Sequence, residues 1–156
     1  MRYACQVWGL CDNVACHRIL TLQKCALRLI TFSVPRTPSN PIFSDLGILK
    51  FFNLVEVLNI LFVHQLFNVD LPEDLLDTFD FDKISHSFNT RGSCLGLKIS
   101  SVNTKTYGLN SFSRLSIQQW NHLQQSFPDI NLAEISYSNL KYLARKFYLE
   151  NIWYEF

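Results

Sequence analysis

The sequence lacks several patterns on which common enzyme classes depend. It has no Gly-x-Ser-x-Gly elbow and no glycine-rich loop that would cradle a phosphate, and only 5 of its 156 residues are glycine. No sequence pattern joins Ser93 or Cys94 to one of the histidines as a nucleophile and its base. We therefore expect the chain alone to have no polymerase, nuclease or protease activity and to need no small-molecule substrate.

A cysteine framework is also missing. The 5 cysteines are an odd number without a Cys-x-x-Cys pair, and no secretory signal precedes them, which predicts a reducing, intracellular location. Cys5, Cys11, Cys16 and His17 could in principle ligate zinc, but their spacing lacks the paired knuckles of structural zinc sites. Buried, apolar cysteine is the favoured interpretation, and we expect no metal and no cofactor.

Long apolar runs are interrupted. The most apolar window, Phe51 to Phe67, contains Asn53, Glu56, Asn59, His64 and Gln65, and it is slightly shorter than the ~20 residues of a membrane span. We expect no membrane partner and a nuclear or cytoplasmic protein.

Charges of each sign are absent from long segments. Residues 83–128 contain no acid, whereas residues 70–82 contain six acids and no base. The segment "DTFDFD" could bind a divalent cation, but it lacks the glycine and distal glutamate of a calcium loop and the Asp-Asp pair of polymerases. A helix start followed by a solvated turn is the favoured interpretation. The basic segments permit an anionic partner.

The residues that are present favour a mainly α protein. Apolar periodicity, prolines and caps predict a helical bundle with a loop-rich basic insertion that could hold a short strand or hairpin around Leu97 to Ser101. In the first helix, Ala15, Ile19, Leu22, Ala26 and Leu29 are expected to face inward. The expected helices cover about residues 14–32, 41–46, 50–69, the segment "LPEDLLDTF", 114–127 and 138–153.

The opposite stripe of the first helix carries Lys24 and Arg28, with Arg18 beside it. Basic residues adjoin aromatic and small polar residues here and in "HSFNTRGS", "KTYGLNSFSR" and "KYLARKFY". Such groups can contact phosphates and stack on bases, although a solvated helix face has the same composition.

Six motifs follow one another along the chain: "YACQVWG", "LQKCALRLIT", "NPIFSDLGILKF", "LPEDLLDTF", "HSFNTR" and "WNHL". With the basic stretch "KTYGLNSF" and the terminal helix, the matching region runs from Tyr3 to about Tyr148. Together they resemble the region after the polymerase core in reverse transcriptases of non-LTR (LINE-type, jockey-like) retrotransposons. Ala4 and Gln124 depart from that pattern, which has glycine and proline there. The catalytic Asp-Asp motif is absent, so the resemblance implies a truncated element or a gene model opened at an internal methionine.

The resemblance implies a non-catalytic fragment of an RNA-directed DNA polymerase that helps to bind template or target. Residues 1–34 would be a thumb-like helical segment, 35–82 a helical extension, and 83–156 a basic loop region with C-terminal helices, all in one compact unit. The partners would be RNA template or target DNA and the missing upstream polymerase core. A helical protein-interaction module, or a decayed element without independent function, is the alternative. The expected nucleic-acid-binding residues are Arg18, Lys24, Arg28, Arg91, Lys105 and Arg114.

Overall fold

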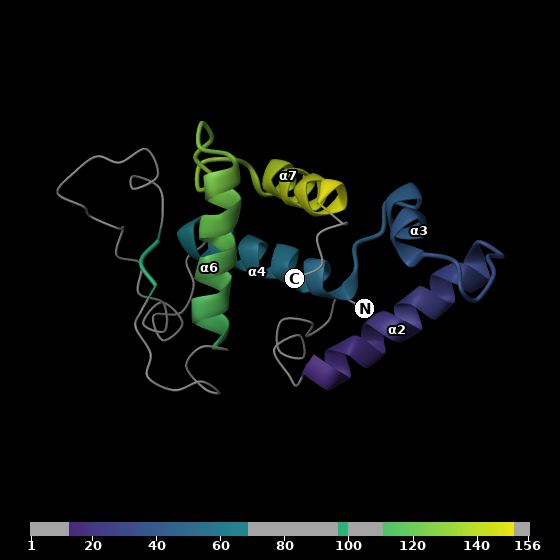
Figure 1. Cartoon of the computed structure of the whole chain (residues 1–156). Coiled ribbons are helices and arrows are strands. Elements are labelled where there is room, and N and C mark those ends of the chain that lie inside the picture. Colours follow the sequence, from purple (N-terminus) through teal and green to yellow (C-terminus); the bar gives the residue numbers. More distant parts are fainter. Residues whose placement is uncertain (1–12, 69–96, 100–110, 152–156) are drawn as a thin grey trace. The chain divides into compact units, whose positions relative to one another are not determined.

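The chain is mainly α-helical in a computed structural model that describes residues 13–68, 97–99 and 111–151 (Figure 1). Helices make up 72% of these described residues, which confirms the predicted fold class. The described part of the predicted strand, residues 97–99, contains no strand, and most of the predicted basic insertion and the "LPEDLLDTF" helix lie outside the described residues. The helices are α2 (Asn13–Ile30), α3 (Ser39–Asp45), α4 (Phe51–Asn68), α6 (Phe112–Ser126) and α7 (Tyr137–Glu150).

The chain divides into two compact units. Unit 1 comprises residues 1–57 and 142–156, and unit 2 comprises residues 58–141. Helices α2 and α3 belong to unit 1 and α6 to unit 2, while α4 and α7 each contribute to both. The predicted boundary after residue 34 falls in the loop between α2 and α3, and the one after residue 82 lies outside the described residues.

The core of unit 1 is built where α3 packs against α2 (Figure 1). Phe43, with 0% of its surface exposed, lies at the centre of a cluster that also includes residues of α2, α4 and α7. The cluster consists of Leu20, Leu27, Ile42 and Phe43, with Ile48, Phe52 and Leu149 packed against it.

The predicted inward face of α2 is wrong. Of its five residues, Ala15, Leu22, Ala26 and Leu29 are exposed, and Ile19 is half-buried. The buried side chains come from the adjacent face and are Cys16, Leu20 and Leu27.

A polar contact fixes this orientation of α2. The side-chain amide of Gln23 donates to the Leu49 carbonyl at 2.8 Å and accepts from the Phe51 N–H at 3.0 Å. Phe51 is the first residue of α4, and its N–H has no partner within that helix. Gln23 therefore acts as a cap supplied by another helix, and it turns the face that carries Leu20 and Leu27 toward the core.

Helices α2 and α3 end in the same hydrogen-bonded motif. After α2, Phe32 N–H donates to Leu29 O and Ser33 N–H to Arg28 O; after α3, Gly47 N–H donates to Ser44 O and Ile48 N–H to Phe43 O. This pairing requires a left-handed residue in the first position beyond the cap, where glycine is usual. Gly47 fills it with φ +60°, whereas α2 places Phe32 there with φ +51°.

Unit 2 packs around α6. The sequence places Leu115, Trp120, Leu123 and Phe127 roughly on one face of this helix. Trp120 and Leu123 are buried, with 2% and 0% of their surfaces exposed, whereas Leu115 and Phe127 are half-buried. The centre of the Trp120 ring lies 5.5 Å from that of Phe67. Asn121 binds both backbone groups of Leu97, accepting from its N–H at 2.7 Å and donating to its carbonyl at 2.6 Å. Trp120, Asn121 and Leu123 of "WNHL" therefore have structural roles in this chain.

Gln124 holds the loop that follows α6. Its buried amide donates to the carbonyls of Phe127 and Ile130 at 3.1 and 2.6 Å and accepts from the Leu132 N–H at 3.1 Å. These three bonds hold the loop after α6. Proline, which stands at this position in the pattern that the chain resembles, has no amide side chain and could make none of these bonds.

Helix α4 is apolar nearly all round. Its sequence predicts an inward stripe of Phe51, Val55, Leu58, Phe62 and Leu66. Phe51, Val55 and Leu66 are buried and Leu58 and Phe62 half-buried, and residues on the other sides of the helix, such as Ile60 and Val63, are buried as well. Within the described residues it is also the one helix that is long and apolar enough to cross a membrane, with half of its length buried in the structure. A core helix of a soluble protein passes the same test, so this is weak evidence for a membrane span.

Candidate nucleic-acid interface

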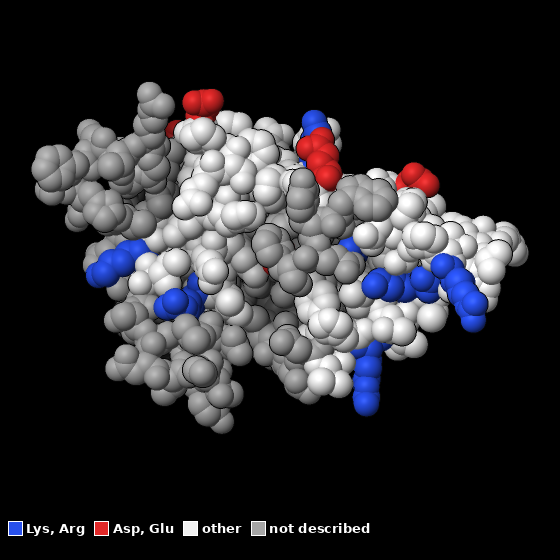
Figure 2. Space-filling view, in the orientation of Figure 1, with Lys and Arg blue, Asp and Glu red and all other residues white. Residues whose placement is uncertain are grey.

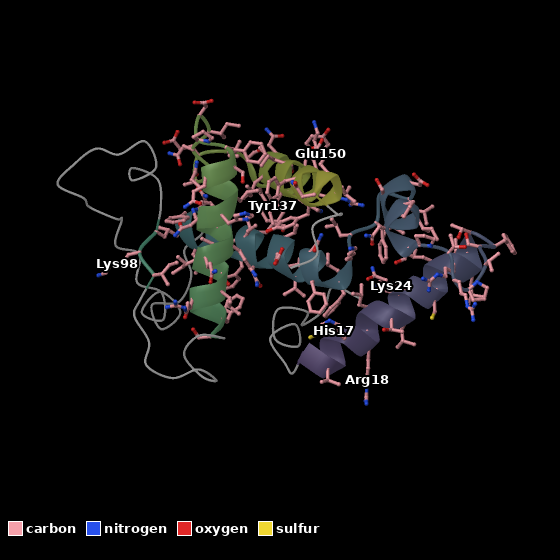
Figure 3. The ribbon with its side chains drawn as sticks, in the orientation of Figure 1. His17, Arg18, Lys24, Lys98, Tyr137 and Glu150 are labelled. Atoms are coloured by element: carbon pink, nitrogen blue, oxygen red, sulfur yellow. The ribbon has the colours of Figure 1, made fainter. Side chains whose placement is uncertain are left out.

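The basic residues of α2 do not form one continuous stripe. Arg18 is exposed, whereas Lys24 and Arg28 are half-buried. Figure 3 shows Arg18 and Lys24 leaving the helix on different sides. Lys24 and Arg28 are four residues apart, so they share one side of α2 and are neighbours on its surface.

Arg28 also has a structural partner. Its Nε donates to the Thr37 carbonyl at 3.0 Å, which ties the end of α2 to the loop before α3. The guanidinium stands in the last turn of the helix, where the macrodipole favours a cation. Arg28 therefore stabilises the fold regardless of any phosphate that it contacts.

The other predicted binding residues are not brought to α2. Arg114 lies on α6 in unit 2 and is half-buried. Arg91 and Lys105 lie outside the described residues. Of the six predicted residues, the described structure thus brings two together, Lys24 and Arg28.

The exposed charge of unit 1 is mostly positive. Its described acids with exposed side chains are Asp45 and Glu150, and Glu150 lies 3.8 Å from the Lys146 ammonium. In Figure 2 the Lys and Arg side chains on the right-hand side of the view lie apart from the acidic ones, which are at the upper edge. The described bases of this unit with exposed side chains are Arg18, Arg36, Arg145 and Lys146. This excess favours an anionic partner.

A shallow hollow in unit 1 adds further basic groups. Arg145 donates from Nη2 to the Gly47 carbonyl at 2.8 Å, so α7 is held against the end of α3. The hollow is lined by Ser44, Tyr142, Arg145, Lys146, Leu149 and Glu150. The hydrogen bond of Arg145 and the ion pair of Lys146 engage both cations with the chain itself.

Two titratable groups that the sequence analysis did not single out meet in unit 1. Burial raises the pKa of Glu56, and the hydrogen bond from Tyr148 partly offsets this. Burial, the nearby Glu56 charge and that same hydrogen bond raise the pKa of Tyr148. A raised carboxyl pKa marks many catalytic acids, but here the partner is a phenol that stays protonated, which is typical of a structural pair. Glu56 was visible in the sequence as a lone acid in an apolar window, and that was its one signal.

Polar groups that looked like candidates for chemistry have structural partners. His64 is buried, and its Nε2 lies 2.7 Å from the Ile135 carbonyl, so Nε2 carries the proton and donates it. His64 is therefore a hydrogen-bonded core residue. Cys16 is buried, and no cluster of three potential metal ligands occurs among the described residues; Cys5 and Cys11 lie outside them.

No protein-family model, curated protein or solved structure matches this chain. The assignment of function therefore depends on the residues and geometry described above.

Proposed function

We propose that the chain is a non-catalytic nucleic-acid-binding segment, corresponding to the region that follows the polymerase core in a non-LTR retrotransposon reverse transcriptase. The observation that carries the proposal is the pairing of Lys24 and Arg28 on one side of α2, in a unit whose exposed charge is mostly basic. The order of six motifs along the chain supports the family. In the cell, the chain would act in the nucleus or cytoplasm on RNA template or target DNA, beside a polymerase core.

Phosphate contact has a measurable consequence. Each neutralised phosphate of duplex DNA releases condensed counterions, so the logarithm of affinity falls with the logarithm of salt concentration by ~0.9 for each contact. Lys24→Gln removes one charge and keeps a good helix former. We expect it to lower this slope by about one contact on two unrelated duplexes alike, since phosphate contacts carry no base information.

Arg28 needs two variants because it also binds the Thr37 carbonyl. Arg28→Gln removes the charge together with the guanidinium, whereas Arg28→Lys keeps the charge and removes the guanidinium. If the charge contacts phosphate, Arg28→Gln lowers the slope of log affinity against log salt concentration, and Arg28→Lys keeps the wild-type slope. If both variants leave the slope unchanged while both lower the thermal stability, Arg28 is structural only.

Two further variants define the interface. Arg18→Gln tests whether the other side of α2 takes part, and Lys146→Gln is the control, because Lys146 is exposed in the same unit and paired with Glu150. An unchanged slope for Lys24→Gln, Arg28→Gln and Arg18→Gln, with helicity intact by circular dichroism, would mean that this surface is merely solvated. The proposal would then be wrong.

A helical protein-interaction module is the second candidate. It is favoured by the large apolar side chains that unit 1 exposes on α2 and just beyond it, of which Leu29 and Phe32 are 76% and 97% exposed. Salt-insensitive association with a protein, together with no salt-dependent binding to DNA, would distinguish this candidate from phosphate binding.

A further inference from the structure

Helix α2 has a second apolar face that the fold does not cover. Ala15, Ile19, Leu22, Ala26 and Leu29 follow one another at steps of four, three, four and three residues. This is the a/d spacing of a heptad repeat, and we call these five residues the heptad face. Four of them are exposed; Leu22 and Leu29 have 68% and 76% of their surfaces accessible.

The residues beside the heptad face extend its apolar surface. Val14 and Ile30, 57% and 65% exposed, lie on its two edges. The three charged residues of the helix are Arg18, Lys24 and Arg28, and Lys24 lies about half a turn from the centre of the heptad face. A contiguous exposed apolar surface of this kind is typical of an interface.

We propose that the heptad face pairs with the heptad face of a second copy of the chain, with the two α2 helices antiparallel and crossing at Leu22. In this arrangement Ala15 of one copy faces Leu29 of the other, so that a small residue meets a large one at both ends. A contact of this form is self-complementary, as a twofold dimer requires.

The position of Arg18 favours the antiparallel arrangement over the parallel one. In a parallel pair the two Arg18 side chains would lie at the same level. In the antiparallel pair, centred on Leu22, they are separated by about 12 Å along the axis, which exceeds the Debye length of about 8 Å at physiological salt. Each Arg18 then lies near Ala26 of the other copy, whose small side chain leaves space for the arginine.

The size of the surface sets the expected strength. Covering the heptad face with Val14 and Ile30 in both copies removes on the order of 1,000 Å² in total, at the low end of specific interfaces. Two and a half heptads would be short for a free coiled coil, but α2 is already held in the fold by Gln23 and the cluster around Phe43. The helix therefore loses little conformational entropy on association, and we expect a weak dimer with a dissociation constant in the micromolar range.

The dimer is independent of the proposed nucleic-acid contact. Lys24 and Arg28 lie on the side of α2 away from the heptad face, so both copies would keep them accessible. Self-association therefore tests the heptad face, and the salt dependence of DNA binding by Lys24→Gln and Arg28→Gln tests the proposed phosphate contact. Arg18 lies beside the heptad face, so Arg18→Gln bears on both and is not used to separate them.

The experiment is sedimentation equilibrium of the full chain over a concentration series from about 1 to about 300 µM, which brackets the expected constant. Wild type should pass from monomer to dimer. Leu22→Gln, at the crossing point and therefore counted twice in the dimer, should weaken association by at least ~10-fold with an unchanged far-ultraviolet spectrum. Tyr142→Gln is the matched control, because Tyr142 is 70% exposed in the same unit but stands on α7, and it should leave association unchanged.

Cross-linking tests the orientation. Chains carrying Ala15→Cys and Leu29→Cys are mixed and oxidised, and the linked peptides are identified by mass spectrometry. The antiparallel pair predicts the mixed 15–29 link. Predominant 15–15 and 29–29 links, a wild type that stays monomeric at about 300 µM, or a Leu22→Gln variant that dimerises like wild type would each overturn the proposal.

Discussion

Replacing Phe32 with glycine should stabilise the chain. Phe32 occupies the left-handed position of the motif that ends α2, with φ +51°, although phenylalanine is strained there. Its side chain is 97% exposed, so the substitution removes almost no buried surface. The hydrogen bonds of the motif are backbone bonds and should remain.

The expected gain is the difference between two terms. Relief of the left-handed conformation contributes ~1–2 kcal/mol. Glycine also makes the unfolded chain more flexible, which costs ~0.5–1 kcal/mol. The net increase in the free energy of unfolding should be about 0.5–1 kcal/mol, or roughly 1–4 °C in the melting temperature.

The matched control is Gly47→Ala, in the same position of the same motif after α3. A Cβ atom at Gly47 would meet nothing within 4 Å, so the φ of +60° alone sets its effect. This variant should lower the free energy of unfolding by about 0.5–1 kcal/mol. Urea denaturation of both variants and wild type measures the two changes. A destabilised Phe32→Gly beside a destabilised Gly47→Ala would refute the reasoning, because it would show that the Phe32 side chain supports the fold.

Two other substitutions test the cores of the two units. Trp120→Ala should cost ~3–5 kcal/mol and abolish the cooperative thermal transition, whereas Trp120→Phe should retain it; retained stability with lost nucleic-acid affinity would instead make Trp120 a stacking residue. Burial raises the pKa of Glu56 above its ordinary 4.5, so the folded state binds this proton more tightly than the unfolded state does. Its contribution to stability is therefore full below pH 4.5 and is lost as pH rises through the raised pKa, and Glu56→Gln should flatten that loss. Urea denaturation of wild type and Glu56→Gln at about pH 4 and pH 7 measures how much stability each protein loses between the two pH values. An equal loss of stability in both proteins would contradict this prediction.

Prolines and strong periodicity located the helices well. Pro35, Pro38 and Pro128 mark helix boundaries, and the predicted ends of α2, α4 and α6 fall within about two residues of those observed. The inward face of α6 was predictable because Trp120 and Leu123 have no competing apolar face on that helix. In such a helix the local hydrophobic pattern alone is enough to predict which face is buried.

The inward face of α2 could not be predicted in this way. The helix carries two adjacent apolar faces, and hydrophobic periodicity does not choose between them. The choice is made by Gln23, whose amide reaches backbone groups of Leu49 and Phe51, 26 and 28 residues further along the chain. A polar contact over that separation leaves no local trace in the sequence. The heptad face is therefore the part of the sequence pattern that the fold leaves unused.

The same limit applies to the candidate binding site. Four-residue spacing correctly placed Lys24 and Arg28 on one side of α2, because that spacing depends on helix geometry alone. The bond from Arg28 to the Thr37 carbonyl was not visible, because it depends on the path of the loop after the helix. Because Arg28 also binds the loop before α3, the fold needs its guanidinium whether or not the chain binds a nucleic acid. Arg28→Lys, which separates the charge from the guanidinium, is for that reason more informative about the binding role of this residue than removal of the charge.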